Sequence, residues 1–155
     1  MPPFEIESLQ SFKQWEGREF PATEWFTVSQ DRIEKFADAT DDRQWIHLEP
    51  ERAARESPFG GCVAHGFLTL SLLSHFLRQA VQVRSGVAMS INYGLNKVRF
   101  PSAVRAGSAM RARVRLLSVK EAADFVDAVF LIHVEGQTSD KPCCVAEWLV
   151  RYYPR

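Results

Sequence analysis

An aspartate and a histidine stand five residues apart in the first third of the chain, at Asp42 and His47. The segment Ala64-His65-Gly66 follows and opens a long apolar run. A carboxylate and an imidazole around one water can take a proton from it and deliver one elsewhere. A backbone N–H at a helix start can stabilise an oxygen that gathers negative charge, and Gly66 lets a substrate approach closely. The pattern therefore indicates proton transfer beside a carbonyl group.

Short helices are predicted to position the first of these residues. Ser29 is the clearest cap, because Asp31 falls in the first turn and apolar residues then recur at helical spacing. Asp42 therefore lies just beyond a helix end and shares a short loop with His47. The short helices expected are residues 8–15, 29–40 and 51–56, the last with Pro50 in its first turn.

A longer helix and a set of strands are predicted for the rest of the chain. From Gly66 to Val81 apolar residues cover nearly the whole circumference of a helix, so we expect other elements to wrap it. Later segments alternate or are rich in β-formers, with glycine and proline between them. The fold class is therefore α+β, one long helix gripped by an antiparallel sheet. The strands expected are residues 87–93, 98–100, 109–119, 125–135 and 143–153.

Composition narrows the class of protein. The chain has 155 residues, enough for one domain over residues 1–155. Its formal net charge is zero, so nothing favours nucleic acid as a partner. The start lacks a basic, then apolar leader, and charged residues interrupt the longest apolar stretch, so we expect a cytoplasmic protein without a membrane segment. The three cysteines, Cys62, Cys143 and Cys144, form neither a disulfide framework nor a zinc-ligand spacing, and we expect no metal and no other cofactor.

The Asp42 and His47 pair, followed by Ala64-His65-Gly66, resembles the MaoC-like branch of the hot-dog fold superfamily. That branch includes (R)-specific enoyl-CoA hydratases and nodulation-protein-like dehydratases. The segment from Asn92 to Pro101 is similar to the strand pair that follows the helix in the dehydratases. The resemblance implies a single MaoC-like hot-dog domain, an antiparallel sheet curved around a central helix, paired in a homodimer or a higher assembly. Asp41 departs from the pattern, since many relatives carry Gly there, and we expect its side chain to face solvent.

By the same resemblance, the chain is a hydro-lyase for an acyl-CoA or acyl-carrier-protein thioester. It hydrates trans-2-enoyl-CoA reversibly to (R)-3-hydroxyacyl-CoA, with Asp42 and His47 as catalytic residues and the Gly66 N–H as the donor to the thioester oxygen. Either His47 deprotonates water while Asp42 exchanges the α proton, or both act on the same water.

Four other residues are candidates for supporting the catalytic pair or for binding the substrate. The resemblance implies that Ser74 steadies the catalytic histidine, although a helix serine that bonds back to its own chain accounts for it as well. Asn92 and Tyr93 fit the lining of an acyl tunnel, and strand chemistry explains them equally. His65 is expected to brace the turn.

Two other functions stay open. A hot-dog thioesterase needs a carboxylate aimed at the carbonyl carbon, usually from the central helix, and residues 66–81 contain no Asp or Glu. A non-catalytic acyl-thioester-binding subunit would keep the fold and the tunnel without the chemistry. The missing carboxylate argues against the thioesterase, and the intact Asp42 and His47 pair favours an enzyme over the binding subunit.

Overall fold

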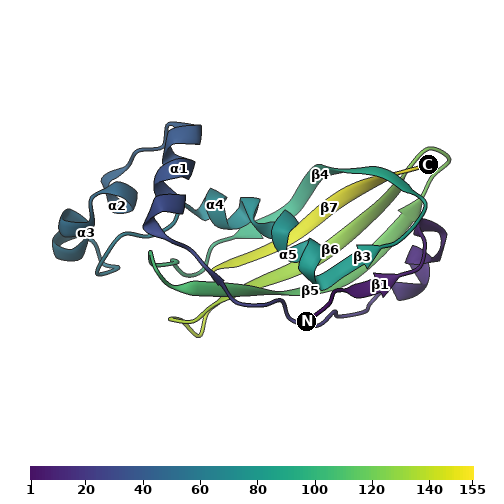
Figure 1. Cartoon of the computed structure of the whole chain (residues 1–155), viewed down its shortest axis with the longest axis horizontal. Helices are drawn as coiled ribbons and strands as arrows, with labels where there is room; N and C mark the ends of the chain where they lie inside the picture. The colour runs from purple at the N-terminus through teal and green to yellow at the C-terminus, as the bar shows by residue number, and fades with distance from the viewer.

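A five-stranded antiparallel sheet in the order β2-β5-β6-β7-β4 forms the body of the protein, and α4 and α5 run along one face of it (Figure 1). This computed structural model describes all 155 residues. A second, two-stranded sheet pairs β1 with β3 in parallel. In chain order the elements are β1 (Phe4–Ile6), the 3-10 helix η1 (Leu9–Trp15), β2 (Phe26–Thr27), α1 (Gln30–Thr40), α2 (Trp45–Leu48), α3 (Pro50–Glu56), α4 (Gly66–Ser71), α5 (Leu73–Ala80), β3 (Val81–Val83), β4 (Val87–Arg99), β5 (Ala109–Glu121), β6 (Val126–Gly136) and β7 (Cys144–Pro154).

The core lies between the sheet and α5. Strands β6 and β7 alternate buried and partly exposed positions, which is the pattern of a sheet with one face on a core. Phe130 of β6 and Trp148 of β7 are cross-strand partners, and both are buried. Leu73 and Phe76 of α5 belong to the same buried cluster. The α+β arrangement expected from the sequence is thus confirmed.

The predicted helix over 66–81 is interrupted. α4 and α5 are separate helices joined at Leu72, and Val81 already begins β3. The expectation that other elements wrap the whole circumference is wrong, because Phe67 is 65% exposed. Apolar content alone did not distinguish a side chain that faces the sheet from one that faces outward.

The predicted strands 87–93 and 98–100 are one strand, β4. Register shifts against β7 fall near Gly94 and Lys97, where a break had been expected. β4 pairs only with β7 and forms an edge of the sheet, so glycine there allows a bulge without ending the strand. The expected strand pair over 92–101 is therefore wrong in this detail.

The helix-capping predictions agree with the structure. Ser29 precedes α1, and its side chain accepts a hydrogen bond from the Arg32 N–H at 3.2 Å. Pro50 is the first residue of α3. Asp41 ends α1 with φ of 57°, a left-handed conformation that glycine adopts freely and aspartate tolerates, and it is exposed as expected. The turn at Asp41 directs the chain into the segment that carries Asp42.

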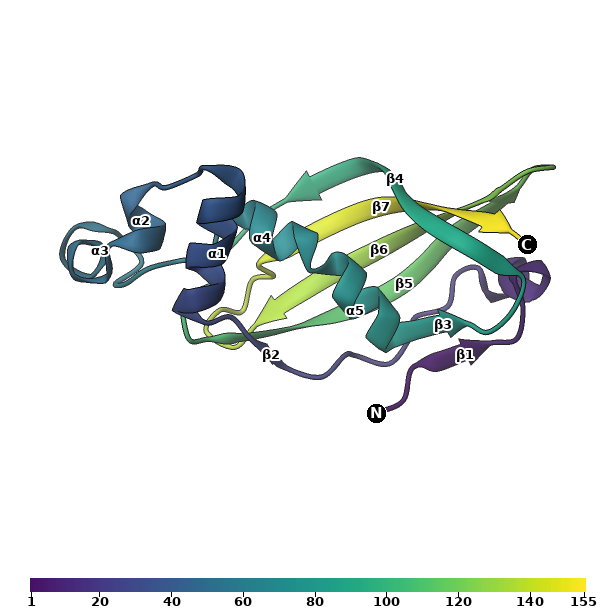
Figure 2. The ribbon, with the colours of Figure 1, turned by 45° about the horizontal axis from the view of Figure 1, so that its top comes forward.

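Helices α1, α2 and α3 gather at one end of the molecule, beyond the end of the sheet (Figure 2). α4 begins beside them and leads back onto the sheet through α5. This end brings together residues from the first and middle thirds of the chain. None of the helices is long and apolar enough to span a lipid bilayer.

Candidate active site

His47 lies on the short helix α2 rather than in the expected loop, and only 6% of its surface is exposed. Its Nδ1 lies 2.6 Å from the carbonyl oxygen of Val63. A carbonyl can only accept, so Nδ1 carries the proton and Nε2 keeps a free lone pair. The Val63 N–H donates in turn to the Ile46 carbonyl at 3.1 Å, and Gln30 Nε2 donates to the His47 carbonyl at 2.7 Å. These bonds hold the ring in the tautomer that can act as a base.

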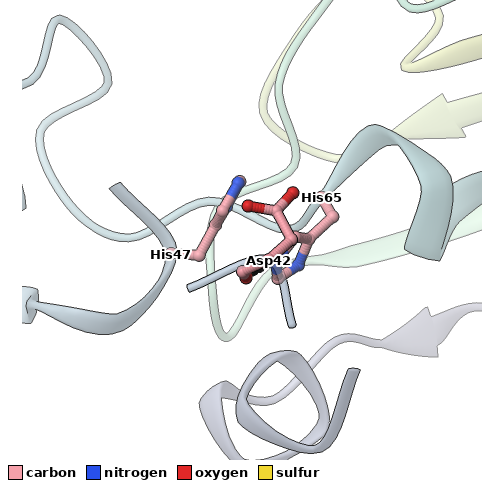
Figure 3. Close-up of side chains that lie close together, drawn as sticks. All are labelled: Asp42, His47 and His65. Carbon is pink, nitrogen blue, oxygen red and sulfur yellow. Dashed lines mark hydrogen bonds between the residues drawn. The ribbon is translucent and has the colours of Figure 1, made fainter. Parts of the chain in front are cut away.

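Asp42 lies in the turn after α1 and is exposed. Its side chain makes no hydrogen bond within the chain, so the carboxylate is available to a substrate or a water. Asp42, His47 and His65 each contribute one polar side-chain atom to a cluster in which all three atoms lie within 4.8 Å of one another. Figure 3 shows the Asp42 carboxylate and a ring nitrogen of His47 on the same side of this cluster. The structure thus brings the two predicted catalytic residues together.

His65 completes the cluster. Its Nε2 donates to the Asp42 carbonyl oxygen at 2.9 Å. Its ring stacks on that of His47, with 3.7 Å between the centroids and 24° between the planes. The sequence predicted only that His65 braces the turn. His65 and His47 each bond to a backbone carbonyl, and their rings stack on each other. Neither kind of contact has a sequence signature.

Burial lowers the pKa of His47 below its usual value of 6.5. The nearby His65 ring lowers it further, while the hydrogen bond to Val63 and the charge of Asp42 act in the opposite direction. The neutral imidazole therefore prevails at neutral pH. This is the form of His47 that can take a proton from water.

Gly66 is the first residue of α4 and directly follows His65. Its N–H has no acceptor within the protein, as expected for a donor in the first turn of a helix. A Cβ at this position would lie 3.2 Å from the ring of Phe100, so a larger residue would fit only if that ring moved. The amide is therefore a free donor next to the Asp42, His47 and His65 cluster.

Two cavities of about 610 and 310 Å³ lie between α5 and the strands β4 and β7. Ser74, Asn92 and Trp148 line both of them. Neither is lined by Asp42 or His47. Ser74 makes no hydrogen bond to His47 and lines the cavities instead, so the expected contact between Ser74 and His47 is not present.

Tyr93 lies away from these cavities, although its neighbour Asn92 lines them. Successive residues of a strand point to opposite faces. The ring of Tyr93 packs against the guanidinium of Arg151, 3.7 Å from the ring centroid. The expected pairing of Asn92 and Tyr93 in one tunnel wall does not occur in this structure.

Asp42, His47 and His65 are also residue types that bind metal ions. An imidazole binds a metal through a lone pair in its ring plane, at about 2.1 Å. With the His47 and His65 rings stacked, their planes 24° apart and their centroids separated by 3.7 Å, the two lone pairs do not converge on one point. The stacked rings therefore do not fit a shared ion, and the geometry suits proton transfer instead.

The cysteines do not fit a nucleophilic role. Cys62, Cys143 and Cys144 are all free and buried. Burial raises the pKa of each thiol above its usual value, most of all for Cys143. None is therefore activated as a thiolate.

Comparison with known proteins extends these observations. A family profile described as MaoC like domain matches residues 11–134. The chain is 46% identical over 148 residues to the 3-hydroxyacyl-thioester dehydratase Z of Mycobacterium tuberculosis. The matched region covers 95% of this chain and 97% of that protein. It is 45% identical over 134 residues to nodulation protein N of Rhizobium leguminosarum, covering 86% and 83%.

Solved structures of low identity share the fold. The MaoC-like dehydratase from Rhodospirillum rubrum superposes with a TM-score of 0.68 at 24% identity, over 90% of this chain and 93% of that one. The (R)-hydratase from A. caviae gives 0.69 at 22% identity, over 87% and 94%. The architecture is thus common to all three chains.

Proposed function

Because the chain belongs to the MaoC-like dehydratase family, we propose that it catalyses the reversible hydration of a trans-2-enoyl thioester to the (R)-3-hydroxyacyl thioester. The hot-dog fold expected from the sequence is confirmed by the sheet, its helix and the shared architecture. The observation that carries the proposal is the cluster itself. The Asp42 carboxylate and a ring nitrogen of His47 lie on one side of it (Figure 3), and the unpaired amide of Gly66 directly follows His65 in the chain.

Each step of the reaction has a group in this arrangement. As water bonds to the β carbon, His47 Nε2 takes its proton and the Asp42 carboxylate accepts a hydrogen bond from it. The electron pair of the double bond moves toward the thioester oxygen, to which the Gly66 N–H donates. The proton that His47 took from water then passes to the α carbon, which returns Asp42 and His47 to their starting protonation states. Acid–base catalysis of this kind contributes about 10²- to 10⁴-fold, and one oxyanion donor about 3 kcal/mol.

The acyl chain is proposed to occupy the cavities along α5. Ser74, which lines both cavities, follows Gly66 by eight residues and lies in α5, beyond the break at Leu72. The larger cavity is mainly apolar, with Leu77, Val150 and Tyr152 in its wall. Such a wall suits an acyl chain that extends away from the thioester. A short enoyl group reaches the cluster without filling the cavities.

The test is a spectrophotometric assay with crotonyl-CoA and a thiol reagent in parallel. Loss of the enoyl absorbance without release of free CoA, with (R)-3-hydroxybutyryl-CoA as the product, supports hydration. Free CoA released in step with substrate consumption indicates a thioesterase. Binding without either change indicates a non-catalytic acyl-thioester-binding subunit, and both of these results refute the proposal.

A second copy of this chain is proposed to pack along β4. This strand has a free edge, and Met89, Ile91 and Leu95 on it are exposed large apolar side chains. An exposed apolar edge strand is prone to pair with another strand, which supports a continuous sheet across a homodimer.

Sedimentation tests this arrangement. The wild type is expected to be a dimer at micromolar concentration, and Ile91→Lys is expected to weaken it. Ser118→Lys, on the exposed surface of β5, is the matched control and leaves the dimer intact. A wild type that stays monomeric, or two lysine variants with the same effect, contradicts it.

A further inference from the structure

We infer that His65 is a positioning residue that aligns Asp42 with His47, an inference that rests on the proposed function. The His65 ring contacts the two residues in different ways. Its Nε2–H donates to the Asp42 backbone carbonyl at 2.9 Å, and one face stacks on the His47 ring at 3.7 Å. One rigid side chain therefore sets the relative placement of both groups.

The position of His65 in the fold makes it rigid. It immediately precedes α4, and only 3% of its surface is exposed. The ring of Phe36 from α1 lies 5.0 Å away, while His47 from α2 stacks on His65 at 3.7 Å. His65 thus lies where α1, α2 and α4 meet, and movement of any of these elements would move the catalytic pair.

Hydrogen bonding fixes the tautomer of His65. The Asp42 carbonyl only accepts, so Nε2 carries the proton and Nδ1 keeps a lone pair. This Nδ1 is buried and has no hydrogen-bond partner. His65 is therefore a fixed donor to Asp42.

The geometry excludes His65 from a direct role in proton transfer. Its Nε2 is committed to the Asp42 carbonyl, and its Nδ1 is enclosed by protein. Its influence on the reaction passes through the two neighbours. The titratable groups that act on His47 are Asp42, from the turn after α1, and His65 itself.

Two substitutions separate the two contacts. His65→Phe keeps an aromatic face against His47 and loses the donor, whereas His65→Gln keeps an amide donor and loses the aromatic face. His65→Phe is expected to lower kcat about tenfold, the contribution of one hydrogen bond, with little change in KM. His65→Gln keeps more of kcat than His65→Phe. Its acid limb in the pH–rate profile moves to higher pH, because His47 loses the stacked ring that buries one of its faces, and burial is the main cause of its lowered pKa.

The inference is supported by a larger loss of kcat in His65→Phe than in His65→Gln, together with a shifted acid limb in His65→Gln. Equal kcat in both variants and the wild type would overturn it. Equal losses with an unchanged acid limb would show a general packing role and would overturn it too. A rise in KM that accounts for the whole loss would place His65 in substrate binding instead.

A measurement on the wild type is independent of turnover. Long-range proton–nitrogen correlation spectra report which ring nitrogen of His65 carries the proton, and the inference requires Nε2. A proton on Nδ1 would overturn it, and this result decides the matter if neither variant folds. If the wild type does not hydrate crotonyl-CoA, the proposed function fails, while the spectra still test the contact between His65 and Asp42.

Discussion

The pH dependence of hydration tests whether His47 acts as the base. Burial and the stacked His65 ring hold the pKa of His47 below 6.5, and the proposed mechanism requires the neutral ring. Because a base must be unprotonated, kcat/KM is expected to fall as acid protonates Nε2. The half-maximal value of kcat/KM is therefore expected below pH 6.5, the usual midpoint of a histidine.

The size of the effect follows from a single ionisation. An unperturbed histidine would be half protonated at pH 6.5, so more than half of the plateau rate should remain at that pH. Well below the midpoint, the rate should fall about tenfold for each pH unit. The assay is the initial rate of crotonyl-CoA hydration at low substrate concentration across the acid range.

The folded protein should also lose stability as the pH falls, so its folding must be measured separately from its rate. The unfolded chain takes up a proton on His47 near pH 6.5, whereas the folded chain does so only at lower pH. The contribution of neutral His47 to stability is thus present above pH 6.5 and is lost as the pH falls toward the folded value. Circular dichroism at each pH shows whether the protein is still folded where the rate falls.

A matched control assigns the acid limb. His75 on α5 also has a lowered pKa, because of burial and the nearby cations of Arg78 and Arg32. His75→Gln should leave the position of the limb unchanged. A midpoint at or above pH 6.5 in the wild type, or a limb that disappears in His75→Gln, would refute the reasoning about His47.

Three further predictions concern the cavities, the core and the thiols. Ser74→Phe fills the junction of the two cavities, so kcat/KM should fall more for a long-chain enoyl-CoA than for crotonyl-CoA, and equal losses would contradict the acyl assignment. Phe76→Ala empties a fully buried site and should lower the free energy of unfolding in urea by about 3 to 5 kcal/mol, against under about 1 kcal/mol for the half-exposed Phe59→Ala. Burial raises the pKa of Cys143 to about 12 and of Cys144 to about 11, so a thiol reagent at about pH 8 should modify them only after unfolding, and rapid labelling of either in the folded protein would contradict this.

The sequence predicted the elements whose local signals agree with their packing. Ser29 and Pro50 mark helix starts, and the alternation of β5 to β7 follows from one buried face. Gly94 misled the prediction, since glycine can mark either a turn or a bulge and only the pairing with β7 decides between them. The break at Leu72 has no residue that signals it.

The sequence predicted the residues of the candidate site but not the contacts that hold them. The spacing of Asp42 and His47 indicated a pair, and Gly66 indicated a free amide at a helix start. The anchoring of the pair was not visible, because it depends on the carbonyl oxygens of Val63 and Asp42, which every residue type provides. Only the fold places His65 against both residues.

The most direct test of the central claim compares three variants in the crotonyl-CoA assay. Asp42→Asn and His47→Ala each remove one proton-handling group and should lower kcat/KM by about 100-fold or more. Asp41→Asn changes the adjacent, exposed carboxylate, in a left-handed conformation that asparagine also adopts, and should keep the wild-type rate. Near wild-type turnover in folded Asp42→Asn or His47→Ala would contradict the account.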